Sequence, residues 1–274
     1  MYVDTHLHLC EPWLSDKEKM TEENRQKVIA DITENRIATW AQSCDIPSFE
    51  KTLEYSRQSE YIFPSFGILP WYAHEYAVRL GEVAKLCEDA LMLGEIGLDE
   101  KYARNKASVP HQRPLFEVFL EASEKHNLIL NLHFRGGLER EGFEYLKSYD
   151  IRKAIFHSYS GPRDMIKEIN DQGYYYSFGA ANFEGRGNPR REQLTERLQL
   201  IPDDLLVLEI DVIQKSNFQV PSEIFPKMLR AVAELKNLTP EEIEAINHRN
   251  VCKLVENNPR LKHMSQMLRI QRTL

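Results

Sequence analysis

The sequence has no uninterrupted run of about 20 apolar residues and no cysteine pair in a CxxC pattern. The first absence argues against a membrane-spanning helix. The four cysteines, Cys10, Cys44, Cys87 and Cys252, are scattered along the chain, which is typical of reduced thiols and not of a disulfide framework. The first predicted strand begins at Tyr2, so we expect no signal peptide, no membrane partner and a cytoplasmic location.

The chain also lacks an excess of basic residues. Its 35 lysines and arginines stand against 42 aspartates and glutamates, which gives a formal net charge of −7. A broad cationic surface that binds nucleic acid non-specifically is therefore disfavoured. A site that reaches phosphate groups through bound metal ions stays compatible with this charge, because the formal value omits such ions.

Eight short apolar runs alternate with longer polar segments of helical periodicity. Each run has the length of a strand and is rich in aliphatic, β-branched or aromatic residues. The runs cover residues 2–9, 37–43, 62–69, 90–97, 128–134, 153–159, 174–180 and 205–211. One intervening helix is predicted over 113–127, where Leu115, Phe116, Phe119, Leu120 and Ala122 form one apolar stripe.

Strands that alternate with helices predict a parallel sheet with right-handed crossovers. Eight such units in 274 residues predict an α/β fold, a (β/α)8 TIM-like barrel that forms one domain over residues 1–274. An open doubly wound sheet is the alternative, but its GxGxxG turn after the first strand is absent. The tail is predicted to be helical, because Thr239, Pro240 and Glu242 form the start of a capped helix.

Polar residues stand near the ends of several predicted strands. His6 and His8 are two apart, so they share one face of the first strand. Other runs end with potential ligands, which are Glu95, His133, His157 and Asp211. The C-terminal ends of barrel strands form the active site, so these six side chains should meet there. Each alone has a structural explanation, but four imidazoles and two carboxylates together are costly to desolvate without a cation.

The number of ligands favours two metal ions over one. Six groups exceed what a single catalytic zinc with an open position needs. Two ions need an anionic bridge, and Glu95 is the best candidate because the run 128–134 has no lysine that could be carbamylated. Zinc, manganese and magnesium all suit mixed nitrogen and oxygen ligands. Asp211 can bind metal and also accept a proton from water, so the predicted chemistry is metal-assisted hydrolysis.

Five ordered motifs resemble the TatD-like metal-dependent hydrolases of the amidohydrolase superfamily. They are "VDTHLHL" (3–9), "LGEIGLD" (93–99), "LHFR" (132–135), "FHSYSG" (156–161) and "LEID" (208–211), and "NHRNVCKLV" (247–255) is similar to the family's closing helix. The resemblance implies a TIM-like barrel, a divalent metal centre and hydrolysis, and many members are described as deoxyribonucleases. The metal ligands that it implies are His6, His8, Glu95, His133, His157 and Asp211, the same six residues.

Two segments depart from the family pattern. The family usually has "GIHP" after the third strand, whereas this chain reads "FGILP" with Leu69 in place of the histidine. After the final aspartate the family commonly continues with Ala-Pro, whereas this chain reads "IDVIQKSNFQVPSE" (210–223). Both segments are expected to line the pocket. The departures therefore bear on the substrate more than on the metal chemistry and predict a divergent member.

Several further residues are candidates for substrate binding. Arg135 lies two residues after His133 and shares its face, where a guanidinium can bind a phosphate or carboxylate; a surface salt bridge is the alternative. Arg186 belongs to a basic loop, 182–191, with Arg190 and Arg191. Trp71 and Tyr72 could stack on a base or pack against the barrel rim. The remaining histidines are expected to be structural; they are His74, His111, His126, His248 and His263.

Three functions are compatible with this pattern. The first is hydrolysis of a phosphodiester, as in a nuclease, with nucleic acid as the partner. The second keeps the barrel and the metals but cleaves an amide, ester or lactone of a small anionic metabolite. The third is a non-enzymatic barrel that binds or regulates, which the complete set of six potential ligands disfavours.

Overall fold

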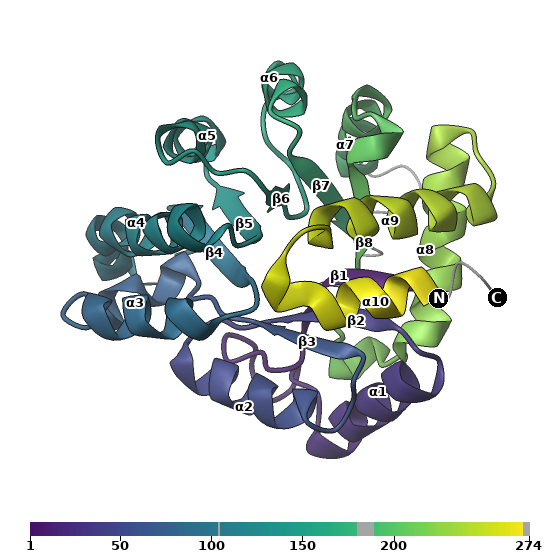
Figure 1. Cartoon of the computed structure of the whole chain (residues 1–274), viewed down its shortest axis with the longest axis horizontal. Coiled ribbons are helices and arrows are strands. Elements are labelled where there is room, and N and C mark those ends of the chain that lie inside the picture. The colour runs from purple at the N-terminus through teal and green to yellow at the C-terminus, as the bar shows by residue number, and fades with distance from the viewer. Residues whose placement is uncertain (104, 180–188, 271–274) are drawn as a thin grey trace.

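The structure is a computed structural model that describes residues 1–103, 105–179 and 189–270, without the side chains of residues 189–191. Eight parallel strands lie at its centre, and helices surround them (Figure 1). The strands are β1 (Val3–His8), β2 (Ala38–Gln42), β3 (Ile62–Ser65), β4 (Leu93–Asp99), β5 (Leu130–Arg135), β6 (Ala154–Phe156), β7 (Tyr175–Gly179) and β8 (Leu206–Glu209).

Backbone contacts close the strands into a barrel. β1–β2–β3 and β4–β5–β6–β7–β8 form two parallel sheets, which isolated parallel bridges join at Leu7–Asp211 and Phe66–Leu93. At the first junction the His8 amide donates to the Asp211 carbonyl at 2.8 Å, and the Asp211 amide donates to the His6 carbonyl at 2.7 Å. The predicted (β/α)8 barrel is confirmed, and the open sheet is wrong. Closure places the ends of the first and last strands side by side.

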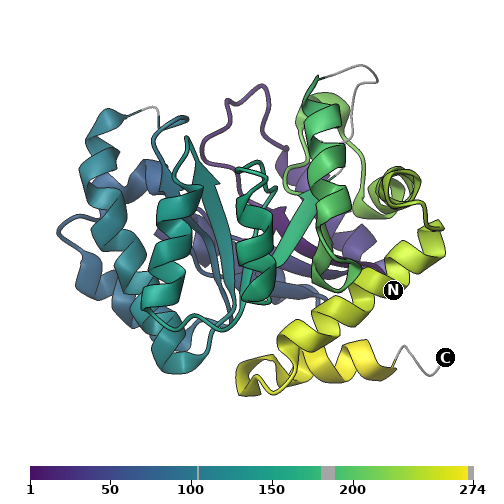
Figure 2. The same ribbon diagram turned by 90° about the horizontal axis from the view of Figure 1, so that it is seen from above.

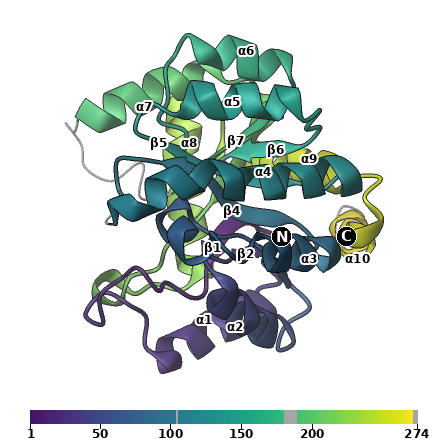
Figure 3. The same cartoon turned by 90° about the vertical axis from the view of Figure 1, so that its left-hand side faces the viewer.

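Ten α-helices are described along the chain. They are α1 (Glu22–Glu34), α2 (Ile46–Ser56), α3 (Leu80–Asp89), α4 (Val109–His126), α5 (Glu139–Ser148), α6 (Met165–Asp171), α7 (Pro189–Leu200), α8 (Pro221–Lys236), α9 (Pro240–Val255) and α10 (Lys262–Ile270). Figure 3 shows α1 and α2 on one side of the barrel and α5 and α6 on the opposite side. None of the helices in the described ranges is long and apolar enough to cross a membrane.

The predicted apolar stripe of α4 is confirmed, because all five of its residues are buried against the core. The helix begins at Val109, four residues before the predicted start at Arg113. Pro110 occupies the first turn, where a missing amide hydrogen costs no helical hydrogen bond. Gln112 then fastens this turn to β4, since its amide group exchanges two hydrogen bonds with the backbone of Asp99.

Helices α9 and α10 cover the end of the barrel where the strands begin (Figure 2). The predicted cap of α9 is confirmed: Thr239 accepts from the Glu242 amide at 3.2 Å, and Glu242 accepts from the Thr239 amide at 2.7 Å. Val251 and Met264 pack with Val3 and other residues from the strand starts in a second apolar cluster. Only the opposite end of the barrel therefore has open loops that can form a site.

Several strand boundaries differ from the predicted runs, and two of the differences lie next to the site. The third strand ends at Ser65 and not at residue 69, and a 3-10 helix begins at Pro70. The fourth strand runs on to Asp99, so Glu95 is its third residue and does not follow the strand end as predicted. All four cysteines are free, as expected.

Candidate metal centre

Six side chains from five parts of the barrel converge at the open end. His6 and His8 come from β1, Glu95 from β4 and His133 from β5, while His157 follows β6 and Asp211 follows β8. Their ligand atoms fall into three groups in which all atoms lie within 4.8 Å of one another. The groups are His6–His157–Asp211, His6–His8–Glu95 and Glu95–His133–His157. Within the described ranges, these groups contain all six predicted residues and no others.

Glu95 lies between two pairs of histidines. Its Oε2 atom is 3.0 Å from His8 Nε2 and 3.6 Å from His6 Nε2. Its Oε1 atom contacts His133 Nδ1 and is 3.7 Å from His157 Nε2. The two oxygens of one carboxylate thus face different pairs, which is the arrangement that a carboxylate bridging two cations requires.

Asp211 lies close to one histidine of each pair and completes the cluster. Its Oδ1 atom is 3.8 Å from His6 Nε2, and its Oδ2 atom is 3.8 Å from His157 Nε2. The backbone of Asp211 has a φ of +71°, a conformation that aspartate adopts more readily than most residues. The side chain is 33% exposed, so one face of the carboxylate is open to the cavity. Partial desolvation raises its pKa.

Outer contacts fix which nitrogen of two histidines points inward. His6 Nδ1 lies 2.9 Å from Asn131 Oδ1, and the Asn131 amide nitrogen donates to the Thr5 carbonyl at 3.0 Å. His157 Nδ1 lies 2.9 Å from Glu209 Oε2. Because an amide oxygen only accepts, His6 carries its proton on Nδ1 and presents the lone pair of Nε2 to the centre of the cluster. A carboxylate acceptor at Glu209 orients His157 in the same way.

The electrostatics of the cluster suit a cation. Burial lowers the pKa of His6 well below its usual value and that of His157 to about 4, so both rings are neutral near pH 7. Burial opposes ionisation of Glu95, but the nearby His133 and His157 outweigh it and hold its pKa well below the usual range. Lone pairs and anionic oxygens therefore converge. This buried set of nitrogen and oxygen donors fits divalent metal ions.

Glu95 has a different effect on the other two histidines. Burial alone would lower the pKa of His8 and of His133, but the Glu95 carboxylate outweighs it and raises both. Glu95 thus favours the protonated form of both rings. Metal ions bind only deprotonated imidazole nitrogens, so protons and metal ions compete for His8 and His133.

The sequence reasoning missed three buried residues that position these histidines. They are Asn131, Glu209 and Asp99, whose Oδ2 lies 3.0 Å from His133 Nε2. Burial raises the pKa of Glu209 to about 7. The signal was present in two motifs: Asp99 ends "LGEIGLD", four residues after Glu95, and Glu209 stands two residues before Asp211 in "LEID". An even spacing along a strand places such residues on the ligands' face.

A cavity of about 320 Å³ opens over the cluster, and Arg135 lines it. The Arg135 guanidinium donates to the Phe134 carbonyl at 2.9 Å. None of the carboxylates in the described part of the chain lies within ion-pair distance of Arg135, so the structure shows no surface salt bridge there. Arg186 lies outside the described residues, as do the side chains of Arg190 and Arg191.

Aromatic and apolar side chains form the other walls. Trp71 packs edge-on against His133 and Trp13, with ring centroids 5.6 Å and 6.0 Å apart, and its Nε1 donates to Asp99 Oδ2 at 2.6 Å. Leu69 is buried and faces the cavity with an apolar side chain. Tyr72 packs against the apolar core instead. The five other histidines are absent from the clusters found in the described ranges.

Comparisons with known proteins place the chain in a family. A family model described as "TatD related DNase" matches residues 3–256. The chain is 26% identical to an uncharacterized metal-dependent hydrolase of Methanocaldococcus jannaschii, with 92% of this chain and 96% of the relative covered. It is 25% identical to the uncharacterized metal-dependent hydrolase YabD of Bacillus subtilis, with 94% and 100% covered.

A relative with a more specific name covers less of the chain. A protein of Erwinia tasmaniensis named 3'-5' ssDNA/RNA exonuclease TatD is 29% identical over 171 residues, with 59% of this chain and 62% of that protein covered. Among solved structures, the TatD homologue YjjV of Escherichia coli has a TM-score of 0.76 at 19% identity, with 92% of this chain and 97% of that chain covered. That likeness shows the barrel fold.

Proposed function

Since the chain belongs to the TatD related DNase family and is a metal-dependent hydrolase, we propose that it hydrolyses phosphodiester bonds of nucleic acid. The observation that carries the proposal is the position of Glu95, whose two carboxylate oxygens face separate pairs of histidines. Because the chain belongs to a family of hydrolases, the third function, a non-enzymatic binding or regulatory barrel, is rejected.

In this proposal the six residues hold two divalent ions. His6, His8 and Glu95 would hold one, and His133, His157 and Glu95 would hold the other, with Asp211 close to both groups. Zinc is favoured by four imidazole ligands, while the carboxylates also suit manganese or magnesium. Bound there, such ions supply Lewis-acid polarisation of a phosphoryl oxygen and lower the pKa of water.

Asp211 is the proposed general base. Its side chain reaches into the cavity, and no hydrogen bond joins its carboxylate to any described residue. A water molecule can therefore donate to it and lose a proton as the water oxygen attacks phosphorus. The P–O bond to one ester oxygen breaks in this step, and the departing alcohol takes up a proton from Asp211 or from solvent. Glu95 contributes to the same step as the ligand that the two ions would share, because it is buried between the two pairs of histidines.

Arg135 is the proposed phosphate ligand. It stands at the end of β5 on the same face as His133 and has no ion-pair partner in the described part of the chain. An unpaired guanidinium at this position attracts an anionic group and supports negative charge as it develops in the transition state. Arg186 is retained in the proposal as a second anion-binding residue. A cytoplasmic location is also part of the proposal, since the four cysteines are free thiols.

One observation favours a second function, cleavage of an amide, ester or lactone in a small anionic metabolite. Leu69 places an apolar side chain in the cavity where the family usually has a histidine, so the pocket departs from the family pattern at this wall. Arg135 would then bind the carboxylate or phosphate of the metabolite.

Activity on a substrate panel tests the two functions. Protein loaded with zinc, manganese or magnesium is offered a single-stranded DNA oligomer, bis(p-nitrophenyl) phosphate, an aryl ester, a lactone and an amide. We expect hydrolysis of both phosphodiesters that a chelator abolishes. The double variant His6→Ala/His8→Ala, purified in parallel, controls for contaminating nucleases and should be inactive. Hydrolysis of the lactone, ester or amide with none of either phosphodiester would replace the nuclease proposal with the second function.

A further inference from the structure

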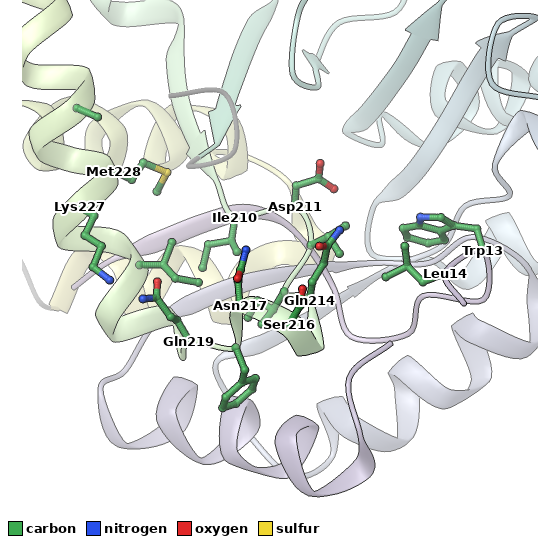
Figure 4. Close-up of a pocket in the computed structure, with 15 residues that line it drawn as sticks. Trp13, Leu14, Ile210, Asp211, Gln214, Ser216, Asn217, Gln219, Lys227 and Met228 are labelled. Atoms are coloured by element: carbon green, nitrogen blue, oxygen red, sulfur yellow. The ribbon is translucent and has the colours of Figure 1, made fainter. Parts of the chain in front are cut away.

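A second and larger cavity, of about 830 Å³, adjoins the metal centre (Figure 4). The segment after β8, helix α8 and residues 13–14 enclose it. The two cavities share Trp13, Asp211 and Val212, so a molecule whose reacting bond lies at Asp211 can extend into the larger one. Its volume falls in the range of ligand pockets. The proposed chemistry at the centre does not use this space.

Part of the lining of the larger cavity is polar but uncharged. Gln214, Ser216, Asn217 and Gln219 contribute amide and hydroxyl groups to its lining. No hydrogen bond joins these four side chains to any residue in the described ranges, so their donors and acceptors are free for a ligand. Met228 and several isoleucines form the apolar part of the wall. Such a lining suits a neutral, flat group that carries its own donors and acceptors.

Lys227 contributes a cation to this cavity, at the end opposite Trp13. Figure 4 shows Lys227 and Met228 on α8 at one end and Trp13 and Leu14 at the other, with Asp211 between them. Lys227 is exposed, and none of the carboxylates in the described part of the chain pairs with it. A free ammonium group there suits an anion such as a phosphate.

We propose that this cavity is a nucleotide subsite. It holds the base and sugar of a nucleotide next to the scissile bond, and Lys227 binds the phosphate beyond that sugar. A nucleobase is flat and has donors and acceptors at its edge, which matches the uncharged polar side chains of the lining, and Trp13, which lines both cavities, offers a surface for stacking. The inference rests on the proposed phosphodiesterase function and specifies its substrate as a chain of at least two nucleotides. A small ester or lactone needs only the 320 Å³ cavity.

Filling the cavity tests the proposal. Ser216→Trp places a large ring in it, and Lys227→Met removes the cation; Lys85→Met, at an exposed lysine of α3, is the matched control. The measured quantity is kcat/KM on a thymidine trinucleotide divided by kcat/KM on bis(p-nitrophenyl) phosphate. We expect this ratio to fall about tenfold or more in Ser216→Trp and about threefold or more in Lys227→Met. Lys85→Met should keep the wild-type ratio, and a wild-type ratio in Ser216→Trp would overturn the proposal.

A binding measurement separates this inference from the proposed function. The probe is a thymidine dinucleotide with a methylphosphonate linkage and a phosphate at each end, titrated calorimetrically into chelator-treated and metal-loaded protein. If the wild type hydrolyses neither phosphodiester, the proposed function fails. The binding measurement alone then decides whether the cavity is a nucleotide subsite. Binding that weakens about tenfold in Ser216→Trp supports the subsite, whereas no binding to the wild type refutes it. If Ser216→Trp fails to fold, the double variant Asn217→Ala/Gln219→Ala takes its place and must also weaken binding of the dinucleotide.

Discussion

Glu209 lies 2.9 Å from Nδ1 of His157 through its Oε2 atom, while its Oε1 atom has no hydrogen-bond partner in the described part of the chain. The carboxylate is fully buried and also accepts from the Ser177 hydroxyl. A carboxylate behind a histidine fixes the ring's orientation and raises its strength as a metal ligand. Glu209 is therefore a positioning residue that acts through His157.

Replacing Glu209 tests that role. In Glu209→Ala the His157 ring loses its acceptor, so we expect the affinity of the weaker-binding ion to fall about 10–100-fold. Glu209→Gln keeps an amide oxygen that can accept the same hydrogen bond, so it should lose less. Competition with a chromophoric chelator measures both binding steps. Glu34→Gln, at an exposed carboxylate of α1, is the control, and equal affinities in all four proteins would disprove the positioning role.

The metal content of the protein is the second prediction. Gently purified protein should contain about two divalent ions per chain, measured by elemental analysis. The double variant His6→Ala/His8→Ala should lose at least one ion, because both nitrogens of the first pair are gone. Protein that contains no metal and takes none up on addition would remove the basis for the centre.

The eight strands could be predicted from the sequence because each is a short apolar run between longer helical segments. The boundaries were less certain where a motif continues past its apolar run. Glu95 was placed at a strand end, but β4 extends through "EIGLD" to Asp99. The glycine and the aspartate in that stretch have low strand propensity, and pairing with β5 overrides it.

Even spacing could have placed Asp99 and Glu209 on the ligands' face, but which histidine each outer residue contacts could not be predicted, since that depends on which strands become neighbours. Asn131 reaches His6 across 125 positions of sequence, and Asp99 reaches His133 across 34. No local pattern encodes such pairs. The larger cavity is likewise lined by residues that are distant in sequence, since Trp13 and Leu14 face the segment after β8 and helix α8 across it.

The third prediction concerns Asn247, the first residue of the closing-helix motif. Its amide oxygen accepts from the Leu208 backbone at 3.0 Å, and its amide nitrogen donates to the Val3 carbonyl at 2.7 Å, so it links β8 to β1 from α9. Asn247→Leu leaves both backbone groups buried and unpaired. We expect the free energy of unfolding to fall by about 2 kcal/mol or more, measured by urea denaturation.

The matched control for Asn247→Leu is Asn257→Leu, at an exposed residue just after α9. We expect only a small change in the free energy of unfolding in this variant, which comes from the left-handed backbone of Asn257. If both variants lose a similar amount of stability, Asn247 does not stabilise the fold by linking β1 to β8.

The fourth prediction concerns Asp211. Asp211→Asn keeps the shape of the side chain but removes the proton acceptor, so kcat on phosphodiesters should fall about 10²–10⁴-fold. At least one metal ion should stay bound, because the three other groups of each site are intact. Full activity of Asp211→Asn at saturating metal would place the general base elsewhere.

The last prediction concerns Arg135. Arg135→Ala removes a guanidinium that lines the cavity, so kcat/KM on phosphodiesters should fall more than about tenfold, or about 1.4 kcal/mol. Arg152→Ala, at an arginine 70% exposed beyond α5, is the control and should leave kcat/KM unchanged. Equal rates for Arg135→Ala and the wild type would exclude this arginine as a phosphate ligand.

Salt separates the contribution of Arg135 from contacts along a strand. If Arg135, Lys227 and Arg186 bind successive phosphates, added salt should weaken binding of an oligonucleotide more steeply than binding of bis(p-nitrophenyl) phosphate. Each variant that removes one phosphate contact should then reduce the slope of log affinity against log salt by about 0.7 for a single strand. A slope that Arg135→Ala leaves unaltered, together with an intact rate on the small diester, would mean that Arg135 binds no phosphate and that the metal centre recognises the scissile one. Lys227 in the larger cavity would then remain the candidate ligand of a neighbouring phosphate.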